Sequence, residues 1–435
     1  MCGILGAVGS ASDGLNDAAF IDALDLIRHR GPDGGAVWHE HEVRLGHRRL
    51  AIVDLAERAE QPMFAGDLAL VFNGEIYNYR ALRAELQGAG HSFKTTSDTE
   101  VLLRAWMQWG RECLERLEGM FAFAMWDRRT RHLTLVRDRF GEKPLFVHRR
   151  AGGLAFASEM PPLIRLAKGT LIEDAAAIGL FFLYSYIPAP YGAFEGVSQL
   201  EPGCWLEWSS TDGLRQGRYY DLHTAVAAAV HAPQPDYATA VVQLRERLTD
   251  AVRLRVETAD VPVATLLSGG IDSSVITTLA ARTTDQPLAV YSLGFPEDPD
   301  FDETDYARAV ARTLPNVQHH VVAATEERVL GFASQVLDRL GEPFADASIL
   351  PTSLLCSQIN EKVALGGDAA DELFAGYGVY PAILRGASLP APLRGLLRLV
   401  PPHSNPSSIA NATLRAAALF HRHLRDDPLD AYLSW

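Results

Sequence analysis

The chain has 435 residues, 48% of them hydrophobic and 22% charged, which is typical of a globular protein of two or three domains. Its formal charge of −14 excludes a surface built for nucleic acid, because phosphate contacts need clustered lysines and arginines. No apolar run is long enough to cross a bilayer, and the first residues lack the basic stretch of a signal peptide. We therefore expect a cytoplasmic protein with neither nucleic-acid nor membrane partners.

The sequence opens with MCGILGAVG, a short apolar run headed by a cysteine. One interpretation makes Cys2 a small buried hydrophobe at the start of a strand. The other begins with removal of Met1, which a small second residue permits. Cys2 would then carry a thiol and a free α-amine, with ordinary pKa values of about 8.5 and about 8, and would combine nucleophile and base in one residue.

Residues 1–206 contain many short strand-like runs, with helix-like stretches at about 17–28, 78–88 and 99–117. This pattern predicts an α/β domain of stacked antiparallel sheets with helices on their faces. Residues 207–237 mix turn residues, alanines and two prolines, so we place a linker there.

Residues 238–435 differ from the first part of the chain in their pattern of predicted strands and helices. A predicted amphipathic helix, with Val241, Leu244, Leu248 and Val252 on one stripe, precedes the apolar strand VPVATLL. Strands and helices then alternate, which predicts a doubly wound parallel sheet whose ligands bind at the carboxyl ends of its strands.

The segment SGGIDSS, residues 268–274, lies between that strand and a helix. Its glycines let the backbone close around an anion, its serines supply hydroxyls, and the helix N-terminus supplies unpaired N–H groups. Asp272 suits Mg²⁺, and the lack of a lysine excludes a kinase-type phosphate loop. A plain glycine turn is the alternative, but the segment resembles the pyrophosphate loop of the N-type ATP pyrophosphatases, which cleave ATP between its α- and β-phosphates.

A second acidic group occurs in GGDAADELFAGY, residues 366–377. Asp368, Asp371 and Glu372 are spaced i, i+3 and i+4, which predicts that they face one side of a first helical turn. They either complement the helix dipole or bind Mg²⁺ and the cationic or metal-bridged groups of a substrate. The nearby phosphate loop favours the second interpretation.

Together these segments resemble glutamine-dependent asparagine synthetase over nearly the whole chain. The motifs that carry the resemblance are CGI (2–4), RHRGPD (28–33), GHRRLAIVD (46–54), NGEIYNY (73–79), SDTE (97–100), RDRFGEKPL (137–145), FASE (156–159), SYIPAP, SGGIDSS, FDETDYA (301–307) and DELFAGY. Each motif alone is weak, and the assignment rests on their combined order and spacing.

The resemblance implies that residues 1–206 form an αββα sandwich of the N-terminal-nucleophile type that hydrolyses glutamine. Cys2 would attack the side-chain amide of glutamine, and the Asn73 side chain with the Gly74 N–H would form the oxyanion hole. The resemblance also implies that Arg49 binds the α-carboxylate of glutamine. Glu75 and Asp98 match the positions that bind its α-ammonium group.

In residues 238–435 the resemblance implies an ATP pyrophosphatase domain. It would activate a carboxylate, in the family that of aspartate, as an acyl-adenylate, which ammonia from the first domain then attacks. The positions implied for ATP are Leu267, Ser268, Gly269, Gly270, Asp272, Ser273, Leu293 and Gly367. The acceptor and adenylate site would comprise Asp368, Asp371 and Glu372, with Asp272 and Asp371 on Mg²⁺. A homodimer is one expected assembly.

Two features depart from the family. Gly366-Gly367-Asp368 replaces the usual Ser-Gly-Glu or Ser-Gly-Asp, which removes a hydroxyl near the AMP and leaves the acceptor open. The family's lysine for pyrophosphate has no counterpart after Lys362, so we expect the second domain to be incomplete at its C-terminal end. Two alternatives stay open: an amidotransferase for another carboxylate, on a sugar, a cell-surface intermediate or a peptide, and a non-catalytic sensor of glutamine or nucleotide.

Overall fold

The computed structural model describes residues 1–378 and 380–381. They form two compact units. The larger unit holds Met1–Gly270 and Ile276–Leu365, and the smaller holds Ile271–Val275 together with the described residues from Gly366 onward. The rest of the predicted second domain lies outside the described residues. Within the described part of the chain, no helix combines the length and the apolar character that crossing a bilayer needs.

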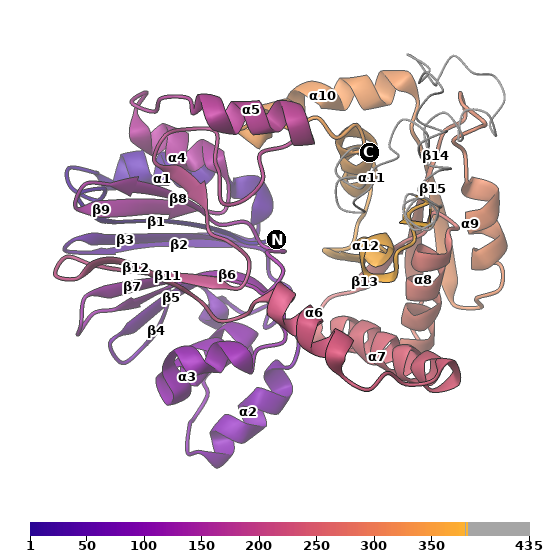
Figure 1. The fold of residues 1–435 in the computed structure, drawn as a ribbon, viewed down its shortest axis with the longest axis horizontal. Coiled ribbons are helices and arrows are strands. Elements are labelled where there is room, and N and C mark those ends of the chain that lie inside the picture. Colours follow the sequence, from indigo (N-terminus) through magenta and orange to yellow (C-terminus); the bar gives the residue numbers. More distant parts are fainter. Residues whose placement is uncertain (379, 382–435) are drawn as a thin grey trace, which may run out of the picture. The chain divides into compact units, whose positions relative to one another are not determined.

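The first part of the larger unit is a sandwich of two antiparallel sheets, each of six strands among the described residues (Figure 1). The first sheet runs, in spatial order, β10 (Val197–Gln199), β8 (Phe146–Arg150), β9 (Gly153–Ala157), β1 (Gly3–Gly9), β3 (Val43–Arg49) and β2 (Gly34–Glu40). The second runs β12 (Gly213–Arg218), β11 (Cys204–Ser209), β7 (His132–Arg137), β6 (Gly119–Asp127), β5 (Leu68–Ile76) and β4 (Met63–Ala65).

Apolar residues that alternate along the facing strands, among them Ile4, Val71 and Phe156, form the core between the two sheets. The outer faces are covered by helices (Figure 1), which are α1 (Asp17–Asp25) and α4 (Met160–Ala167) on the first sheet and α2 (Tyr79–Gly88) and α3 (Asp98–Trp109) on the second. Short 3₁₀ turns are η1 (Arg28–Arg30), η2 (Glu57–Ala59) and η3 (Gly110–Glu115). The predicted αββα sandwich is confirmed. The three predicted helices are present, but α3 ends at Trp109 and η3 follows it, short of the predicted end at residue 117.

The second sheet continues into the segment predicted to be a linker. Ser209 and Asp212 close a hairpin turn, in which the Asp212 N–H donates to the Ser209 Oγ over 2.9 Å, and β12 then pairs with β11 along its whole length. Turn residues therefore join two strands here instead of ending the sheet. The helices α6 (Leu222–His231) and α7 (Tyr237–Thr258) follow.

The larger unit also contains a parallel sheet of four strands among the described residues, in the order β15 (Val317–Ala323), β14 (Leu288–Gly294), β13 (Val263–Leu266) and β16 (Val363–Leu365). Its two faces have separate cores. One core takes residues from α7, α8 (Ile271–Thr283) and α9 (Thr304–Ala311), and the other from α10 (Glu326–Leu340) and α11 (Ile349–Ser357). The predicted doubly wound parallel sheet is confirmed. Because the strand order reverses between β13 and β16, the loops after these two strands start side by side.

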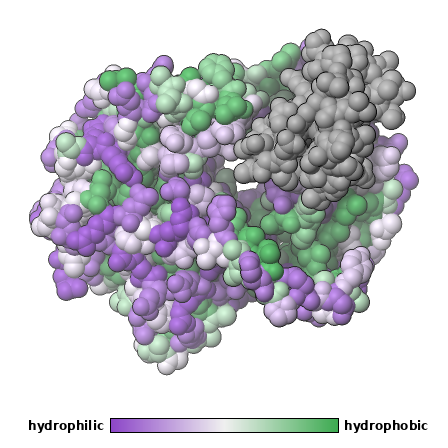
Figure 2. Space-filling view, in the orientation of Figure 1, coloured by the Kyte–Doolittle hydropathy of each residue, from purple (hydrophilic) through white to green (hydrophobic). Residues whose placement is uncertain are grey.

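Some apolar side chains stay on the surface. On α5 (Ala175–Tyr184), Phe182 is 82% and Leu183 is 68% exposed, and Figure 2 shows apolar residues gathered over this helix. The predicted apolar stripe of α7 is buried only toward its C-terminal end, where Val252 packs, whereas Val241 and Leu244 are exposed. Periodicity located this helix correctly but overestimated how much of it is covered.

Candidate active sites

Cys2 lies at the head of β1, with its thiol against the backbone of the residue that follows β3. The Leu50 N–H donates to Sγ over 3.4 Å, and Sγ donates to the Leu50 carbonyl over 3.7 Å. The residue is half-buried, and burial raises the pKa of the Cys2 thiol above its ordinary value. The thiol is therefore protonated at neutral pH and needs a base before it can act as a nucleophile.

A base lies next to it at the amino terminus. Burial, aided by the charges of Arg30 and Lys143, lowers the pKa of the Met1 amine to about 6. Arg30 is fixed in this place, since its Nε donates to the Cys2 carbonyl over 2.9 Å and its Nη1 pairs with Glu159 over 2.7 Å. An amine in these surroundings is neutral at pH 7 and can accept a proton.

Two carboxyl groups lie close enough to influence the charge of this thiol. Glu75 is on β5, and Asp98 begins α3, where its Oδ2 accepts from the Ile76 N–H over 3.0 Å. Burial raises the pKa of both carboxyls, that of Asp98 to about 6, and the charge of Asp98 adds to the effect on Glu75. An ammonium group bound here would restore their charged forms, so the pair suits the α-ammonium group of an amino acid.

Asn73 shares a face of β5 with Glu75, because alternate residues of a strand point the same way. Its side chain is fully buried, yet neither Nδ2 nor Oδ1 has a hydrogen-bond partner among the described residues. A buried amide without a hydrogen-bond partner lowers the free energy of unfolding by about 1–3 kcal/mol. At Gly74 a Cβ would lie 2.2 Å from the Met120 carbonyl oxygen, so only glycine lets β5 and β6 pair this closely. An unpaired buried donor of this kind suits an oxyanion hole.

Arg49 ends β3 and is buried. Its Nη1 donates to the Ala56 carbonyl over 2.9 Å, and its Nη2 donates to the Asp54 carbonyl. These two backbone acceptors hold the planar group without neutralising it. Lys362 and Arg49 both lower the pKa of the Asp33 carboxyl, so this acid lies within reach of the charge of the guanidinium. The planar geometry of the guanidinium suits a carboxylate ligand.

The loop after β13 begins the candidate nucleotide site. Predicted positions in the larger unit are Leu267, Ser268, Gly269, Gly270 and, on β14, Leu293. Gly269 has a φ of +94°, and a Cβ there would lie 2.5 Å from the Tyr306 Cβ. The Gly270 N–H donates to the Ser268 Oγ over 3.2 Å. Glycine is therefore required at position 269 both by backbone conformation and by the close approach of α9.

The smaller unit holds the remaining predicted nucleotide positions. Asp272 and Ser273 lie in the first turn of α8. A Cβ on Gly367 would lie 2.8 Å from the Ser273 backbone nitrogen and 3.0 Å from the Asp272 Cβ. The two segments, distant in sequence, are thus packed against each other, and the glycine permits that approach.

The expectation that three acids share one helical turn is wrong for Asp368. Helix α12 (Ala370–Phe374) begins only after Ala369, whose φ of +67° is left-handed and interrupts the helical run. Asp371 and Glu372 do lie in its first turn, where Glu372 accepts from the Tyr377 hydroxyl over 2.7 Å. Among the described residues no three His, Cys, Asp or Glu side chains are grouped to hold a metal ion. Asp272 and Asp371 do not by themselves make a site of three protein ligands, so their role toward Mg²⁺ stays a prediction, and we derive no step from it.

Comparison with known proteins identifies the family. Residues 1–220 match the glutamine amidotransferase domain family, and residues 243–434 match the asparagine synthase family. The chain is 35% identical to asparagine synthetase (glutamine-hydrolyzing) 3 of Bacillus subtilis and 37% identical to a putative asparagine synthetase (glutamine-hydrolyzing) of Mycobacterium bovis, over 87% and 91% of its own length. It spans 63% of the length of each of these two relatives. It is 30% identical to putative asparagine synthetase (glutamine-hydrolyzing) 2 of Methanocaldococcus jannaschii, with 87% of this chain and 76% of that protein covered.

This chain belongs to the glutamine-hydrolysing asparagine synthetase family.

Sequence reasoning on this asparagine synthetase family member did not single out Arg30 and Lys143, which flank the amino terminus. Both lie inside family motifs, RHRGPD and RDRFGEKPL. The burial of Lys143 had no local signal, because lysine is almost never fully buried unless it is paired. Nothing local indicated that both cations meet at residues 1 and 2.

Lys362, the last lysine of the chain, forms an ion pair with a residue near the start of the chain. Its Nζ pairs with the Asp33 carboxylate over 2.6 Å and donates to the Ala51 carbonyl over 3.4 Å. Lys362 directly precedes β16, and Ala51 lies two residues after Arg49. In this asparagine synthetase family member the lysine thus joins the parallel sheet to the segment that follows Arg49.

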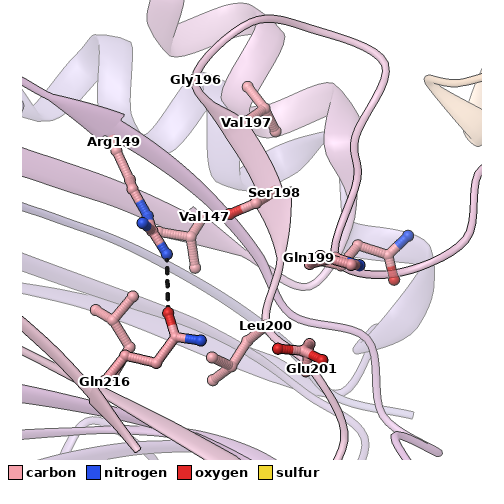
Figure 3. A pocket seen from close by; sticks show the side chains of 11 residues that line it. Val147, Arg149, Gly196, Val197, Ser198, Gln199, Leu200, Glu201 and Gln216 are labelled. Atoms are coloured by element: carbon pink, nitrogen blue, oxygen red, sulfur yellow. Dashed lines mark hydrogen bonds between the residues drawn. The ribbon is translucent and has the colours of Figure 1, made fainter. Parts of the chain in front are cut away.

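A cavity of about 370 Å³ opens at the edge formed by β8, β10, β11 and β12. Figure 3 shows Arg149 pointing across it toward Gln216, to which its Nη2 donates over 3.1 Å. None of the residues that line it is a predicted site residue. The candidate sites are therefore assigned from side-chain chemistry and not from the size of a cavity.

The unpaired amide of Asn73 leads to a prediction for this asparagine synthetase family member. We expect Asn73→Ala to lower the rate of glutamine hydrolysis by about 10²–10³-fold, because an oxyanion donor is lost. The Asn73→Ala change should not lower the melting temperature by removing hydrogen bonds, because the Asn73 side chain makes none among the described residues.

The matched control is Asn78→Ala. The Asn78 Nδ2 donates to the Arg116 carbonyl over 2.8 Å, and its Oδ1 accepts from the Glu118 N–H over 3.0 Å. This variant should melt at a lower temperature and hydrolyse glutamine at the normal rate. Normal hydrolysis by Asn73→Ala would contradict the oxyanion assignment.

Proposed function

We propose that this protein hydrolyses glutamine at Cys2 and transfers the ammonia to aspartate activated as β-aspartyl-AMP, yielding asparagine, glutamate, AMP and pyrophosphate. The observation that carries the proposal is the half-buried Cys2 thiol at the head of β1, where burial, Arg30 and Lys143 lower the pKa of the adjacent Met1 amine. A protonated thiol and a neutral amine are the forms that the first step requires.

In the proposed first half-reaction, Sγ of Cys2 attacks the side-chain carbonyl carbon of glutamine and a C–S bond forms. The amine of Cys2, exposed once Met1 is removed, takes the thiol proton and passes it to the amide nitrogen. The C–N bond then breaks, ammonia leaves, and water hydrolyses the thioester to glutamate. Asn73 and the Gly74 N–H stabilise the oxyanion, while Arg49, Glu75 and Asp98 hold the α-carboxylate and α-ammonium groups.

In the proposed second half-reaction, the loop 268–273 binds the ATP phosphates that leave as pyrophosphate, Leu267 and Leu293 line the adenosine pocket, and Gly367 approaches the AMP. Asp368, Asp371 and Glu372 are proposed for the acceptor side. Mg²⁺ is proposed to arrive bound to the ATP phosphates, as part of the substrate. The acceptor is the least constrained assignment, because Gly366 and Ala369 supply no hydroxyl in this segment.

We further propose that the glutaminase domain extends through the β11–β12 hairpin, later than the predicted boundary at residue 206, and that the synthetase domain begins near residue 238. A cytoplasmic location is proposed, and it is supported by four cysteines that form no disulfide with one another. The homodimer stays a prediction, which sedimentation of the full-length protein would measure.

The bond cleaved in ATP tests the synthetase half of the proposal. With ATP, Mg²⁺, aspartate and glutamine, the full-length protein should form AMP and pyrophosphate in step with asparagine and glutamate. ADP and orthophosphate as the first products would contradict the pyrophosphatase assignment. Pyrophosphate release that depends on a carboxylate other than aspartate would replace the acceptor only, and an absence of both hydrolysis and release would favour the sensor.

A further inference from the structure

Lys143 is a buried cation with an unusual partner. It lies in the segment between β7 and β8 and is 4% exposed. Among the described residues, the hydrogen bond of its Nζ is to the Sδ atom of Met1, over 2.8 Å. A thioether is a weak and uncharged acceptor, so this bond does little to offset the cost of burying a charge. Burial accordingly lowers the pKa of Lys143.

The backbone of Lys143 is fixed by buried groups. Its N–H donates to Asp138 Oδ2 over 3.0 Å, and its carbonyl accepts from Arg137 Nε over 2.8 Å. Arg137 and Asp138 are themselves buried at the end of β7. The fold therefore directs this lysine toward the amino terminus, and its position is not that of a mobile surface side chain.

Several other charged or titratable groups surround the amino terminus and Lys143. They are Cys2, Arg30, Glu75, Asp98, Asp138, Glu142 and Glu159. On the amine itself, Cys2 and Glu75 favour the protonated form, whereas Arg30 and Lys143 favour the neutral form. Arg30 is paired with Glu159 over 2.7 Å, which offsets much of its charge. Within the described residues Lys143 has no such ion pair, and Glu142, Glu75 and Asp138 act on its charge without contacting its ammonium within ion-pair distance.

Removal of Met1 takes away the thioether that Lys143 contacts and makes the amine of Cys2 the new amino terminus. We propose that Lys143 is a positioning residue for glutamine hydrolysis, whose ammonium holds the amine of Cys2 in the unprotonated form that accepts the thiol proton. The inference rests on the proposed glutaminase function and adds a residue to it. Lys143 itself exchanges no proton with the substrate in this scheme.

The test compares two substitutions in the full-length protein. Lys143→Met removes the charge and keeps an apolar stem of similar length, whereas Lys143→Arg keeps the charge. Lys168→Met removes an exposed lysine at the end of α4 and is the matched control. For each protein, kcat and KM for glutamine hydrolysis are measured from about pH 5 to about pH 9, and intact mass verifies that Met1 is absent.

Losing a nearby positive charge raises the pKa of an amine, so hydrolysis by Lys143→Met should need a higher pH. We expect the acidic limb of its kcat/KM profile to move up by about one pH unit, with about a tenfold loss near pH 6 and little loss above about pH 8. The effect should fall on kcat, because Glu75, Asp98 and Arg49 still bind glutamine. Lys143→Arg and Lys168→Met should keep the wild-type limb.

Each other outcome is informative. A wild-type limb in Lys143→Met, or an equal loss at every pH in both the methionine and the arginine variants, would overturn the inference, because the second result describes a purely structural residue. A change confined to KM would also overturn it and would place Lys143 in glutamine binding. Lack of hydrolysis by the wild-type protein, with Met1 removed, would instead overturn the proposed function.

Discussion

Replacement of Cys2 by alanine should abolish glutamine hydrolysis, with a loss of about three orders of magnitude or more. In the proposed mechanism the thiol forms the covalent bond to the substrate, and Asn73, Glu75 and Arg49 bind or stabilise groups without being able to form that bond. Use of free ammonia should continue, because we propose that adenylation depends on the loops of the parallel sheet. Glutamate release and ammonium-dependent AMP formation measure the two activities separately.

Alanine at position 2 is small enough to permit removal of Met1, so processing is not altered by the change. Cys356→Ala, at an exposed position on α11, is the matched control and should keep both activities. If a folded Cys2→Ala protein lost both activities equally, the assignment of the thiol to the glutamine half-reaction alone would be untenable.

The second large effect is expected at Gly269. In Gly269→Ala the new Cβ would lie 2.5 Å from the Tyr306 Cβ and 2.6 Å from the Ala307 backbone nitrogen, and the φ of +94° is one that alanine rarely adopts. The loop must shift, and a displacement of about 1 Å at a reacting group can cost about 10²-fold in rate. We expect AMP formation to fall by about 10²-fold or more while glutamine hydrolysis persists.

Gly331→Ala provides the control for Gly269→Ala. A Cβ on Gly331 meets nothing within 4 Å, and the residue lies inside α10, where alanine is the better helix former. This variant should keep ATP cleavage and gain slightly in stability. AMP formation at the wild-type rate by Gly269→Ala would mean that the loop after β13 does not hold the phosphates.

Local sequence patterns predicted the elements well where one physical cause dominates. Ser97 and Asn16 are side-chain caps that begin α3 and α1, so these helices start where the sequence indicates. The alternation of β13, α8 and β14 is that of a parallel sheet, and Gly269 and Gly270 lie between β13 and α8 as predicted. Prediction failed where a single backbone angle decides: the φ of +67° at Ala369 removes Asp368 from the helix that spacing alone implied.

The sequence by itself determined the family and the two kinds of sheet, and it predicts the nucleophile at position 2, because each depends on residue type and order along the chain. Only the tertiary structure decided which charges meet. Arg30, Glu75 and Lys143 come from separate parts of the sandwich, yet all three act on the amino terminus. The proton affinity of a buried group is set by the desolvation and the neighbouring charges that folding imposes, and these long-range contacts have no counterpart in local spacing.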